Sequence, residues 1–329
     1  MTEMMRAVGF DTFGDPSVLR IVTVPRPLPG RGQVLVKVAA ATVNPTDLGF
    51  RAGGRALPPD VEPPYIAGMA LAGVIDAVGP EVAGPDGAGR PAGAAGAAWK
   101  AGDRVMAAVS PSRPGGGAQA EYVIVDADQL ARVPDGWSLI EAATLPMNGL
   151  TVRAALDMLA LPPGATLAVT GSAGIVGQFA IQLGRHEGLT VIGDAAPAEV
   201  ELIESFGADR VVPRGVGTED GIREIYPDGV DAIIDAALLG PAVIGAVRHG
   251  GQFLAVRPYQ GEPERDISIH LVLVGNHLHE GHRIAELADL VSKGVLTLRV
   301  ADVRPADHAP EAHRRLAAGG VRGRIVLTF

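Results

Sequence analysis

Short apolar segments separated by Gly and Pro dominate the first part of the chain. Strands are predicted at residues 6–10, 19–22, 34–38, 71–75, 104–109 and 121–125. Strands of this length, bounded by turn-forming residues, are typical of an antiparallel, barrel-like arrangement. Residues 83–98 are almost all Gly, Ala and Pro, so we expect them to form a surface loop.

The spacing of apolar positions changes after residue 126. Helical spacing covers residues 139–145 and 152–161. Strands are then predicted at 166–170, 190–193, 210–212, 230–235 and 251–256, with helices at 176–186 and 198–206. This alternation indicates parallel βαβ units, and hence a doubly wound α/β domain. An apolar strand at 267–274, helices at 283–293 and 309–318, and a closing strand at 323–329 complete the prediction.

Composition narrows the class of protein. The 329 residues, 47% of them hydrophobic, favour two domains. The absence of cysteine excludes disulfides, thiolate nucleophiles and cysteine-rich zinc sites. A net charge of −9 argues against a nucleic-acid partner. No apolar run is long enough to span a membrane and no secretion signal is recognisable, so we expect a cytoplasmic protein.

A glycine-rich loop carries the clearest chemical signal. The predicted strand at 166–170 runs directly into Gly171, Ser172, Ala173, Gly174, Ile175, Val176 and Gly177, and a helix follows. In such a strand-to-helix turn the backbone N–H groups and the positive helix end face an anion, with no bulky side chain in the way. The loop is therefore expected to hold the pyrophosphate of a dinucleotide, and a plain structural turn is the alternative.

Two residues give opposite indications about that dinucleotide. Asp194 lies at the end of the second strand, 17 residues after Gly177, where an acid accepts hydrogen bonds from the adenosine ribose of NAD. Arg214, just after the third strand, favours the 2′-phosphate of NADP. A helix-capping Asp and a solvated Arg are the alternatives. Ala236 and Val256, at the ends of later strands, are also expected to line the cofactor site.

The order of several motifs resembles the medium-chain dehydrogenase/reductase superfamily, in its zinc-independent quinone oxidoreductase branch. The matching segments are 43–47, 51–53, 66–74, 101–105, 149–151, 171–177, 207–209 and 323–327, which span nearly the whole chain. The resemblance implies a GroES-like β-barrel catalytic domain, formed by residues 1–125 and 265–329, around a Rossmann dinucleotide-binding domain at 126–264. It also implies that the cofactor lies in the cleft.

Zinc ligands are missing from the positions that the resemblance assigns to them. Zinc-dependent relatives carry Cys where Asn44 stands and His-Glu where Met69 and Ala70 stand. Without a Lewis-acid metal, we expect an acceptor that is already electrophilic, such as a quinone or an α,β-unsaturated carbonyl.

The same resemblance suggests site residues. Asn44 would lie beside the nicotinamide ribose and carboxamide, with its amide able to donate to cofactor or substrate, and Thr151 would contact the cofactor. Tyr65 and Arg51 are candidate hydrogen-bond donors to a substrate carbonyl. A turn residue, a helix-start hydroxyl and simple packing are the respective alternatives for Asn44, Thr151 and Tyr65.

Two remaining segments bear on metal binding and assembly. The histidine-rich run at 277–282 lacks the i, i+4 spacing of a zinc helix, so we interpret it as a polar surface turn. An exposed apolar strand at 267–274 would risk aggregation unless it paired, and we expect a homodimer.

The sequence thus predicts a metal-free enzyme that transfers hydride from NAD(P)H, with NADP(H) favoured over NAD(H), to a small quinone or α,β-unsaturated carbonyl. The alternatives are a catalytically weak NADPH-binding protein with a structural or redox-sensing role, and an enoyl reductase of a biosynthetic pathway.

Overall fold

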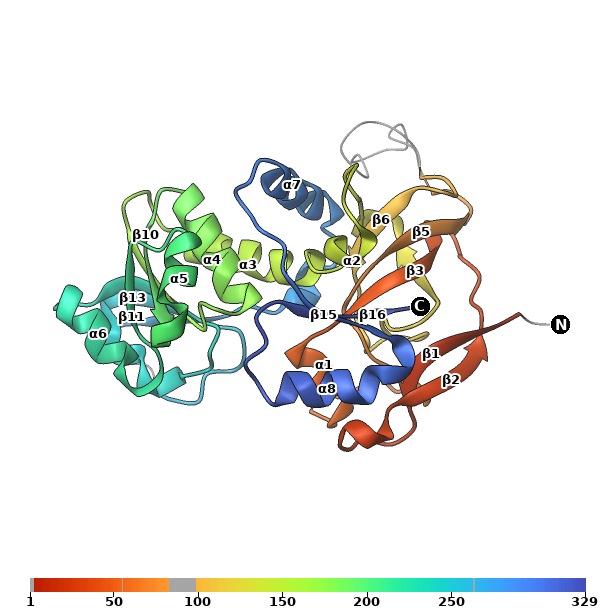
Figure 1. Ribbon diagram of the computed structural model, residues 1–329, viewed down its shortest axis with the longest axis horizontal. Coiled ribbons are helices and arrows are strands. Elements are labelled where there is room, and N and C mark those ends of the chain that lie inside the picture. Colours follow the sequence, from red (N-terminus) through yellow and green to blue (C-terminus); the bar gives the residue numbers. More distant parts are fainter. Residues whose placement is uncertain (1–2, 55, 83–98, 263) are drawn as a thin grey trace. The chain divides into compact units, whose positions relative to one another are not determined.

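The computed structural model describes residues 3–54, 56–82, 99–262 and 264–329 (Figure 1). The surface loop expected at residues 83–98 lies outside this part of the chain. Two compact units are present: unit 1 comprises Met1–Met147, Gly275–Ser292 and Leu298–Phe329, and unit 2 comprises Asn148–Val274 and Lys293–Thr297. No helix in the described ranges is long and apolar enough to cross a membrane.

Unit 1 is built mainly from β-sheet. A small sheet has the strand order β2 (Arg20–Pro25), β1 (Met4–Phe10), β4 (Tyr65–Ile66). The larger sheet has the order β15 (Val300–Pro305), β16 (Arg324–Thr328), β3 (Gln33–Val43), β5 (Ala70–Val78), β6 (Arg104–Ala108), β8 (Leu130–Arg132), and β7 (Tyr122–Asp126) also pairs with β3. Alternate side chains such as Val34 and Val36 of β3 are fully buried against Leu71 and Val105, which gives the period of two expected of a sheet with a packed face.

The carboxyl-terminal segment completes the barrel unit. Strand β16 pairs antiparallel with β3, with Ile325 opposite Val43. Helix α8 (Ala309–Ala317) contributes Ala309 and Ala312 to a second core that contains Phe10. The other helices of the unit are α1 (Pro45–Arg51), α2 (Leu139–Ala142) and α7 (Gly281–Ser292). The closing strand predicted from the sequence therefore belongs to the amino-terminal barrel.

The described residues of unit 2 form one parallel sheet of six strands. Their order is β11 (Arg210–Pro213), β10 (Thr190–Ala195), β9 (Thr166–Thr170), β12 (Val230–Asp235), β13 (Val247–Ala255), β14 (Ser268–Leu271). The helices are α3 (Pro146–Leu159), α4 (Ile175–His186), α5 (Val200–Ser205) and α6 (Thr218–Ile225). From β9 the chain adds strands toward one edge of the sheet, through β10 to β11, and then crosses back to add β12, β13 and β14 on the other side of β9. The boundary between β9 and β12 is therefore the topological switch point of a doubly wound fold. The predicted fold class is confirmed in both units.

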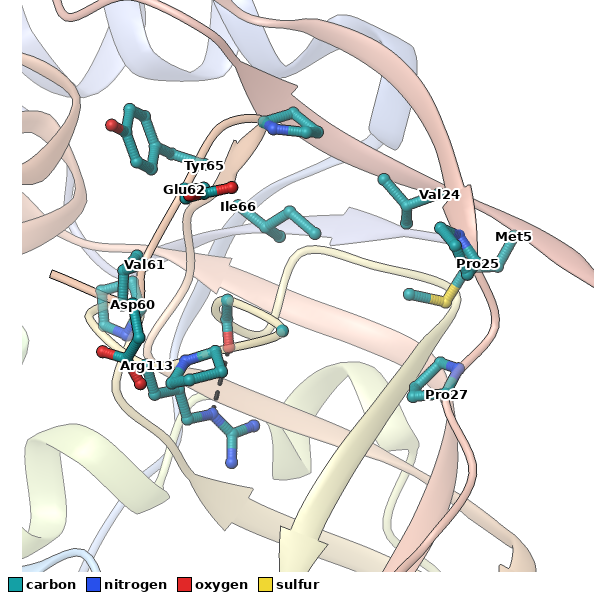
Figure 2. A pocket seen from close by; sticks show the side chains of 15 residues that line it. Met5, Val24, Pro25, Pro27, Asp60, Val61, Glu62, Tyr65, Ile66 and Arg113 are labelled. Carbon is teal, nitrogen blue, oxygen red and sulfur yellow. Dashed lines mark hydrogen bonds between the residues drawn. The ribbon is translucent and has the colours of Figure 1, made fainter. Parts of the chain in front are cut away.

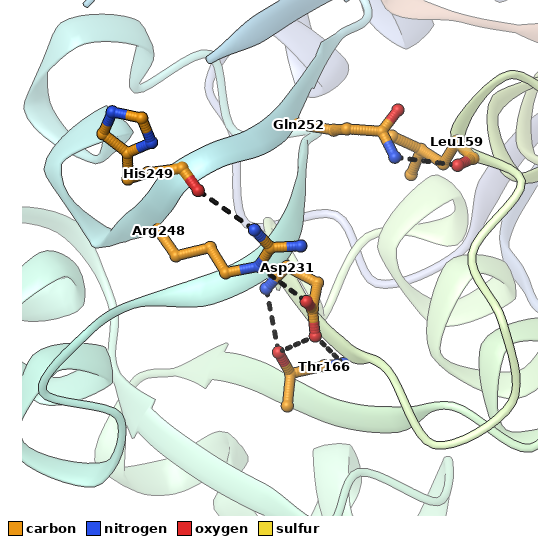
Figure 3. Close-up of polar contacts among 6 residues, drawn as sticks. All are labelled: Leu159, Thr166, Asp231, Arg248, His249 and Gln252. Carbon is orange, nitrogen blue, oxygen red and sulfur yellow. Dashed lines mark hydrogen bonds and ion pairs between the residues drawn. The ribbon is translucent and has the colours of Figure 1, made fainter. Parts of the chain in front are cut away.

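Polar contacts tie three strands together at their amino-terminal ends (Figure 3). Asp231 of β12 accepts hydrogen bonds from the backbone N–H and the hydroxyl of Thr166 in β9, both at 2.8 Å. Its other oxygen accepts a 2.8 Å bond from Nε of Arg248 in β13. Gln252 of β13 donates to the carbonyl of Leu159 at the end of α3. The carboxyl-terminal ends of the strands are left for other contacts.

The limits of the two units differ from the predicted domain boundaries. Residues 126–147 group with unit 1 because β8 pairs with β6, and residues 265–274 group with unit 2 because β14 pairs with β13. Residues 293–297 also group with unit 2, where Gln178 donates to the Thr297 carbonyl at 2.7 Å. Strand β14 is shorter than the predicted strand at 267–274, since a 3-10 turn begins at Val274.

Candidate functional site

The glycine loop of unit 2 forms a tight turn between β9 and α4. Strand β9 ends at Thr170, and Gly171 follows with φ of 67°, in the left-handed region that favours glycine. Gly174 is the N-cap of α4, and the helix begins at Ile175. The loop therefore delivers the chain directly from a parallel strand into a helix N-terminus.

Two glycines of the loop are required by close backbone approach. A Cβ atom at Gly177 would lie 2.3 Å from the Gly171 carbonyl oxygen and 2.7 Å from Cα of Ser172. A Cβ atom at Gly171 would lie 3.1 Å from backbone atoms of Ala236 and Ala237. Ala236, half-buried after β12, is thus a direct neighbour of the loop.

The loop uses part of its own hydrogen-bonding capacity. The N–H of Ser172 donates to Oδ1 of Asp194 at 2.9 Å, and the N–H of Gly174 donates to the Gly171 carbonyl at 2.9 Å. A helix leaves its first N–H groups without an intrahelical acceptor. The groups suited to an anion are therefore those of Ile175, Val176 and Gly177, at the positive end of α4.

Asp194 and Arg214 have different environments. Asp194 is buried at the end of β10, and its backbone N–H donates to the Ser172 hydroxyl at 2.9 Å. Arg214 is half-exposed just after β11 and forms an ion pair with Glu199 at 2.9 Å. The carboxylate therefore supports the loop, while the guanidinium is already paired.

A cavity of about 350 Å³ opens in unit 2 beyond the carboxyl-terminal ends of β12 and β13. Its lining includes Asp235, Phe253, Arg257 and Tyr259. Asp235, which the sequence analysis did not single out, accepts hydrogen bonds from the Thr170 hydroxyl at 2.6 Å and from two backbone N–H groups of the next turn. Asp235 lies on β12 beside the switch point with β9, where ligands usually bind in this fold class, and the cavity extends from there toward β13.

The two other cofactor candidates of unit 2 are Val256, after a strand, and Thr151, within a helix. Val256 is half-buried immediately after β13, next to the cavity-lining Ala255. Thr151 is buried inside α3, several residues past the helix start.

Asn44 of unit 1 belongs to a buried polar cluster. Its side-chain Nδ2 donates to the Thr42 hydroxyl at 2.9 Å and to Oδ2 of Asp47 at 3.3 Å, and its backbone N–H donates to the same Oδ2 at 2.7 Å. Oδ1 of Asp47 accepts a 3.0 Å bond from the N–H of Gly68. The side-chain Oδ1 of Asn44 has no hydrogen-bond partner within the described residues.

Asp47 is the titratable member of this cluster. Complete burial raises its pKa to about 6, although hydrogen bonds from Asn44 and Gly68 and the charge of Arg324 oppose the rise. Arg324 on β16 is buried as well, and burial lowers its pKa to about 10. The Asn-x-x-Asp spacing at the start of α1, a helix-capping pattern, is the sequence signal from which Asp47 was identifiable.

Gln119 is a second residue that sequence reasoning missed. It is fully buried, and its Nε2 donates to the Thr42 carbonyl at 3.2 Å. Its Oε1 lacks a partner in the part of the chain that the structure describes. The segment around Gln119 pairs with the backbone of Ala67 and Gly68, so the two loops reach the cluster together.

The structure gives Arg51 and Tyr65 other neighbours. Arg51, buried at the end of α1, donates to the Gly14 carbonyl. The ring of Tyr65 stacks on Phe13 at 5.1 Å and lies near Phe10. Figure 2 shows Tyr65 at the edge of a cavity of about 290 Å³ in unit 1, with Met5 and Val24 on another side. Neither Asn44 nor Arg51 lines that cavity.

The histidine-rich segment makes pairwise polar contacts. His277 contacts Glu280 at 3.0 Å and His279 contacts Asp128 at 2.9 Å. Across the described ranges, no group of three or more His, Asp and Glu side chains is arranged to hold a metal ion. Met69 and Ala70 are buried side chains without a ligand atom for zinc.

Comparison with known families agrees with both units. Residues 30–135 match the alcohol dehydrogenase GroES-like domain, and residues 206–327 match the family described as zinc-binding dehydrogenase. With the barrel unit, the parallel sheet and its glycine loop, these matches show that the chain belongs to the medium-chain dehydrogenase/reductase superfamily of oxidoreductases. Within it, the chain belongs to the quinone oxidoreductase-like branch.

Individual relatives differ in how much of their length the chain covers. Pig quinone oxidoreductase is 27% identical over 342 residues, which cover 99% of this chain and 98% of that protein. The pikromycin polyketide synthase component PikAII of Streptomyces venezuelae is 28% identical over 331 residues, but the chain spans only 8% of its length. A mycobacterial protein solved in complex with NADPH has a TM-score of 0.82 and 28% identity, over 99% of this chain and 100% of that one.

Proposed function

We propose that this oxidoreductase transfers hydride from a reduced nicotinamide dinucleotide to a quinone or to the β-carbon of an α,β-unsaturated carbonyl. The observation that carries the proposal is the turn from β9 into α4, where Gly171 and Gly177 pack backbone against backbone and leave the helix N-terminus open to an anion. A pyrophosphate fits this cradle because backbone N–H groups face it and Gly171, Gly174 and Gly177 bring no side chain into the turn.

The dinucleotide supplies the hydride when bound, and the chain's own residues bind and orient. The N–H groups of Ile175, Val176 and Gly177 would hold the pyrophosphate. Asp194 would keep the loop in shape through its bond to Ser172. Thr151, Ala236 and Val256 are proposed as further contacts of the same cofactor.

We propose NADP(H) as the dinucleotide, on the ground that the chain resembles the solved NADPH complex. Two features of unit 2 limit the preference. The charge of Arg214 is already paired with Glu199, and the carboxylate of Asp194 stands at the strand end where it favours a ribose hydroxyl over a 2′-phosphate.

We propose a reaction without a metal. Asn44, Met69 and Ala70 replace the Cys and the His-Glu pair of zinc-dependent relatives, and neither Met69 nor Ala70 offers the imidazole or carboxylate that zinc requires. An acceptor that is already electrophilic needs no Lewis acid to polarise it. Asn44, Tyr65 and Arg51 remain the proposed substrate-side residues, although Arg51 is bonded to the Gly14 carbonyl.

The test is oxidation of NADPH and NADH by a panel of quinones and enones, alongside direct binding of both dinucleotides. We expect turnover with at least one acceptor class. Binding without any turnover would favour the second candidate, a dinucleotide-binding protein with a structural or redox-sensing role. A third candidate, an enoyl reductase of a biosynthetic pathway, is supported by the match to a segment of a polyketide synthase, and turnover of thioester-linked enoyl substrates alone would favour it.

A further inference from the structure

Two buried amide side chains of unit 1, those of Asn44 and Gln119, both donate a hydrogen bond from their nitrogen to Thr42. Asn44 donates from Nδ2 to the side-chain oxygen of Thr42 at 2.9 Å. Gln119 donates from Nε2 to the backbone carbonyl of Thr42 at 3.2 Å. The three residues are fully buried.

Both amides leave their oxygen atoms unused. Oδ1 of Asn44 and Oε1 of Gln119 are buried and have no hydrogen-bond partner among the residues that the structure describes. Buried polar atoms are nearly always paired in folded proteins, and each exception calls for an explanation. An unpaired buried acceptor destabilises the folded chain, so a bound donor group would be favourable at each oxygen.

The orientation of each amide is fixed by its neighbours. If the Asn44 amide turned over, its oxygen would face the carboxylate of Asp47, and its nitrogen would lose two acceptors. Asp47 is itself held in place by the N–H groups of Asn44 and Gly68, at 2.7 and 3.0 Å. If the Gln119 amide turned over, its oxygen would face the Thr42 carbonyl. Repulsion between acceptors therefore makes the unpaired atom an oxygen in both cases.

We propose that Asn44 Oδ1 and Gln119 Oε1 are ligand-contacting acceptors that bind N–H or O–H groups, and that Thr42 and Asp47 are the positioning residues that present them. The proposal rests on the proposed function, because the ligand is the reduced dinucleotide or its electron acceptor. The donors are either the carboxamide and ribose hydroxyls at the nicotinamide end or a hydroxyl group on the acceptor. An amide oxygen repels the negative charge that develops on a carbonyl oxygen, so neither residue stabilises that charge.

The first arm of the experiment tests the dinucleotide. Dissociation constants of NADPH and of adenosine 2′,5′-bisphosphate, which lacks the nicotinamide and its ribose, are measured for the wild type, Asn44→Ala and Gln119→Met. Loss of one neutral hydrogen bond weakens binding about threefold to tenfold. We expect that loss for NADPH and none for the bisphosphate if the dinucleotide supplies the donors.

The second arm tests the electron acceptor. At saturating NADPH, kcat/KM is compared for 4-hydroxycyclohex-2-enone and its 4-methoxy analogue, which has no O–H donor. If the acceptor supplies the donor, Gln119→Met and Asn44→Ala lower kcat/KM for the hydroxy compound about threefold to tenfold and leave the methoxy compound unchanged.

A matched control separates the ligand contact from packing. Gln129 is also a buried glutamine of unit 1, but its Oε1 already accepts a bond from the N–H of Asp126 at 3.1 Å. Two ratios are compared: the dissociation constant of NADPH relative to that of the bisphosphate, and kcat/KM for the hydroxy compound relative to the methoxy compound. Gln129→Met is expected to leave both ratios unchanged, even if it lowers the melting temperature as much as Gln119→Met. Unchanged ratios in both arms for folded Gln119→Met and Asn44→Ala would overturn the proposal.

The positioning role has its own test. Thr42→Val removes the hydroxyl that orients Asn44 but keeps the carbonyl that orients Gln119. In whichever arm the Asn44 and Gln119 variants change the ratio, the effect of Thr42→Val should not add to that of Asn44→Ala. It should add to that of Gln119→Met. Full additivity with both would contradict positioning by Thr42.

The two proposals fail in different ways. A wild type that binds NADPH but reduces no acceptor contradicts the proposed function, and the first arm still decides the role of the two amides. A wild type that turns over normally, with ratios unaffected by the substitutions, contradicts only the role of the amides. A wild type that neither binds nor turns over contradicts both.

Discussion

Buried titratable side chains in unit 1 differ in how completely they are paired. Asp47 accepts three hydrogen bonds and feels the charge of Arg324. His313, fully buried on α8, has no partner for either ring nitrogen within the described residues. Burial, followed by the charge of Arg51, lowers the pKa of His313 to about 3. Histidine thus stays neutral in the folded chain at any ordinary pH.

His313→Leu is expected to stabilise the protein more at pH 5 than at pH 7.5. The folded pKa of His313, about 3, lies below its unfolded value of 6.5, so the unfolded chain gains a proton first and stability is lost as the pH falls below 6.5. At pH 5 the variant escapes a loss of about 2 kcal/mol. Urea unfolding of both proteins at both pH values measures this difference.

The contribution of Asp47 to stability has the opposite pH dependence and cancels in this comparison. Its folded pKa of about 6 exceeds the unfolded value of 3.8, so its contribution grows as the pH falls from 6 to 3.8 and is lost as the pH rises. Because both proteins retain Asp47, the difference between them isolates His313. Equal stabilisation at the two pH values would contradict the prediction.

Asp194→Asn is expected to raise the preference for NADPH over NADH about tenfold, since a negative charge near a 2′-phosphate costs at least on the order of 1 kcal/mol. The amide oxygen still accepts from the N–H of Ser172, so the loop keeps its shape. The ratio of the two dissociation constants measures the effect. An unchanged ratio would mean that Asp194 does not face the adenosine ribose.

At the scale of single elements, the glycine loop depends on backbone packing. Gly177→Ala would place a Cβ atom 2.3 Å from the Gly171 carbonyl oxygen, and both contacting groups are backbone. We expect NADPH affinity to fall at least about tenfold, equivalent to one charge-assisted hydrogen bond. Isothermal titration measures it. Gly217→Ala is the matched control, because its new Cβ atom would lie 3.5 Å from Pro213, an ordinary contact. Similar affinities for the two variants would contradict the role of the loop.

The hydrogen bonds of Asp231 with Thr166 and Arg248, at the amino-terminal ends of the strands, are expected to have a purely structural role. Asp231→Ala leaves the N–H of Thr166 and Nε of Arg248 without their acceptor. We expect a loss of about 1–3 kcal/mol in the free energy of unfolding, with NADPH affinity unchanged, because the glycine loop follows the opposite end of β9. Chemical unfolding and dinucleotide titration of the same variant separate the two effects, and a loss of affinity without a loss of stability would be inconsistent with it.

Elements with a strong local pattern were predictable from the sequence. Strand β9, the loop and α4 combine a buried apolar run, a glycine turn and helical spacing within 21 residues, 166–186. Helix α6 was missed because TEDGIREI contains only two apolar residues. Strand β15 was missed because VADVRP leads straight into a proline and carries two charges.

The two unpaired oxygens of Asn44 and Gln119 depend on contacts between distant parts of the chain, which local sequence patterns do not contain. Asn44 and Gln119 are 75 positions apart in the sequence, and they share Thr42 only because β3 and β7 pair in one register, with Gln119 just before β7. Asn44 was identified by resemblance, but its amide was expected to donate. In the structure, Thr42 and Asp47 occupy the nitrogen, and among the described residues the oxygen is left as the unpaired atom.

For the whole molecule, we propose a homodimer that forms through the free side of β14. In the described sheet, β14 is an edge strand, and Leu273 just beyond it is 50% exposed. Light scattering should give the mass of two chains, and Leu273→Asp should shift it toward one. Leu28→Asp is the control, since Leu28 is 86% exposed in unit 1. A monomeric wild type would contradict the proposal.

Hydride transfer from the dinucleotide to the acceptor is the central step of the proposed reaction. The direct measurement is mass spectrometry of the product formed from cyclohex-2-enone and NADPH that carries deuterium on the reactive face of its nicotinamide. Both diastereomers of the labelled cofactor are used, since the face is not specified in advance. We expect one deuterium on the β-carbon of the product with one diastereomer, and loss of product formation in Gly177→Ala. A product without deuterium from either diastereomer, or bound NADPH that reduces neither this enone nor any quinone, would contradict it.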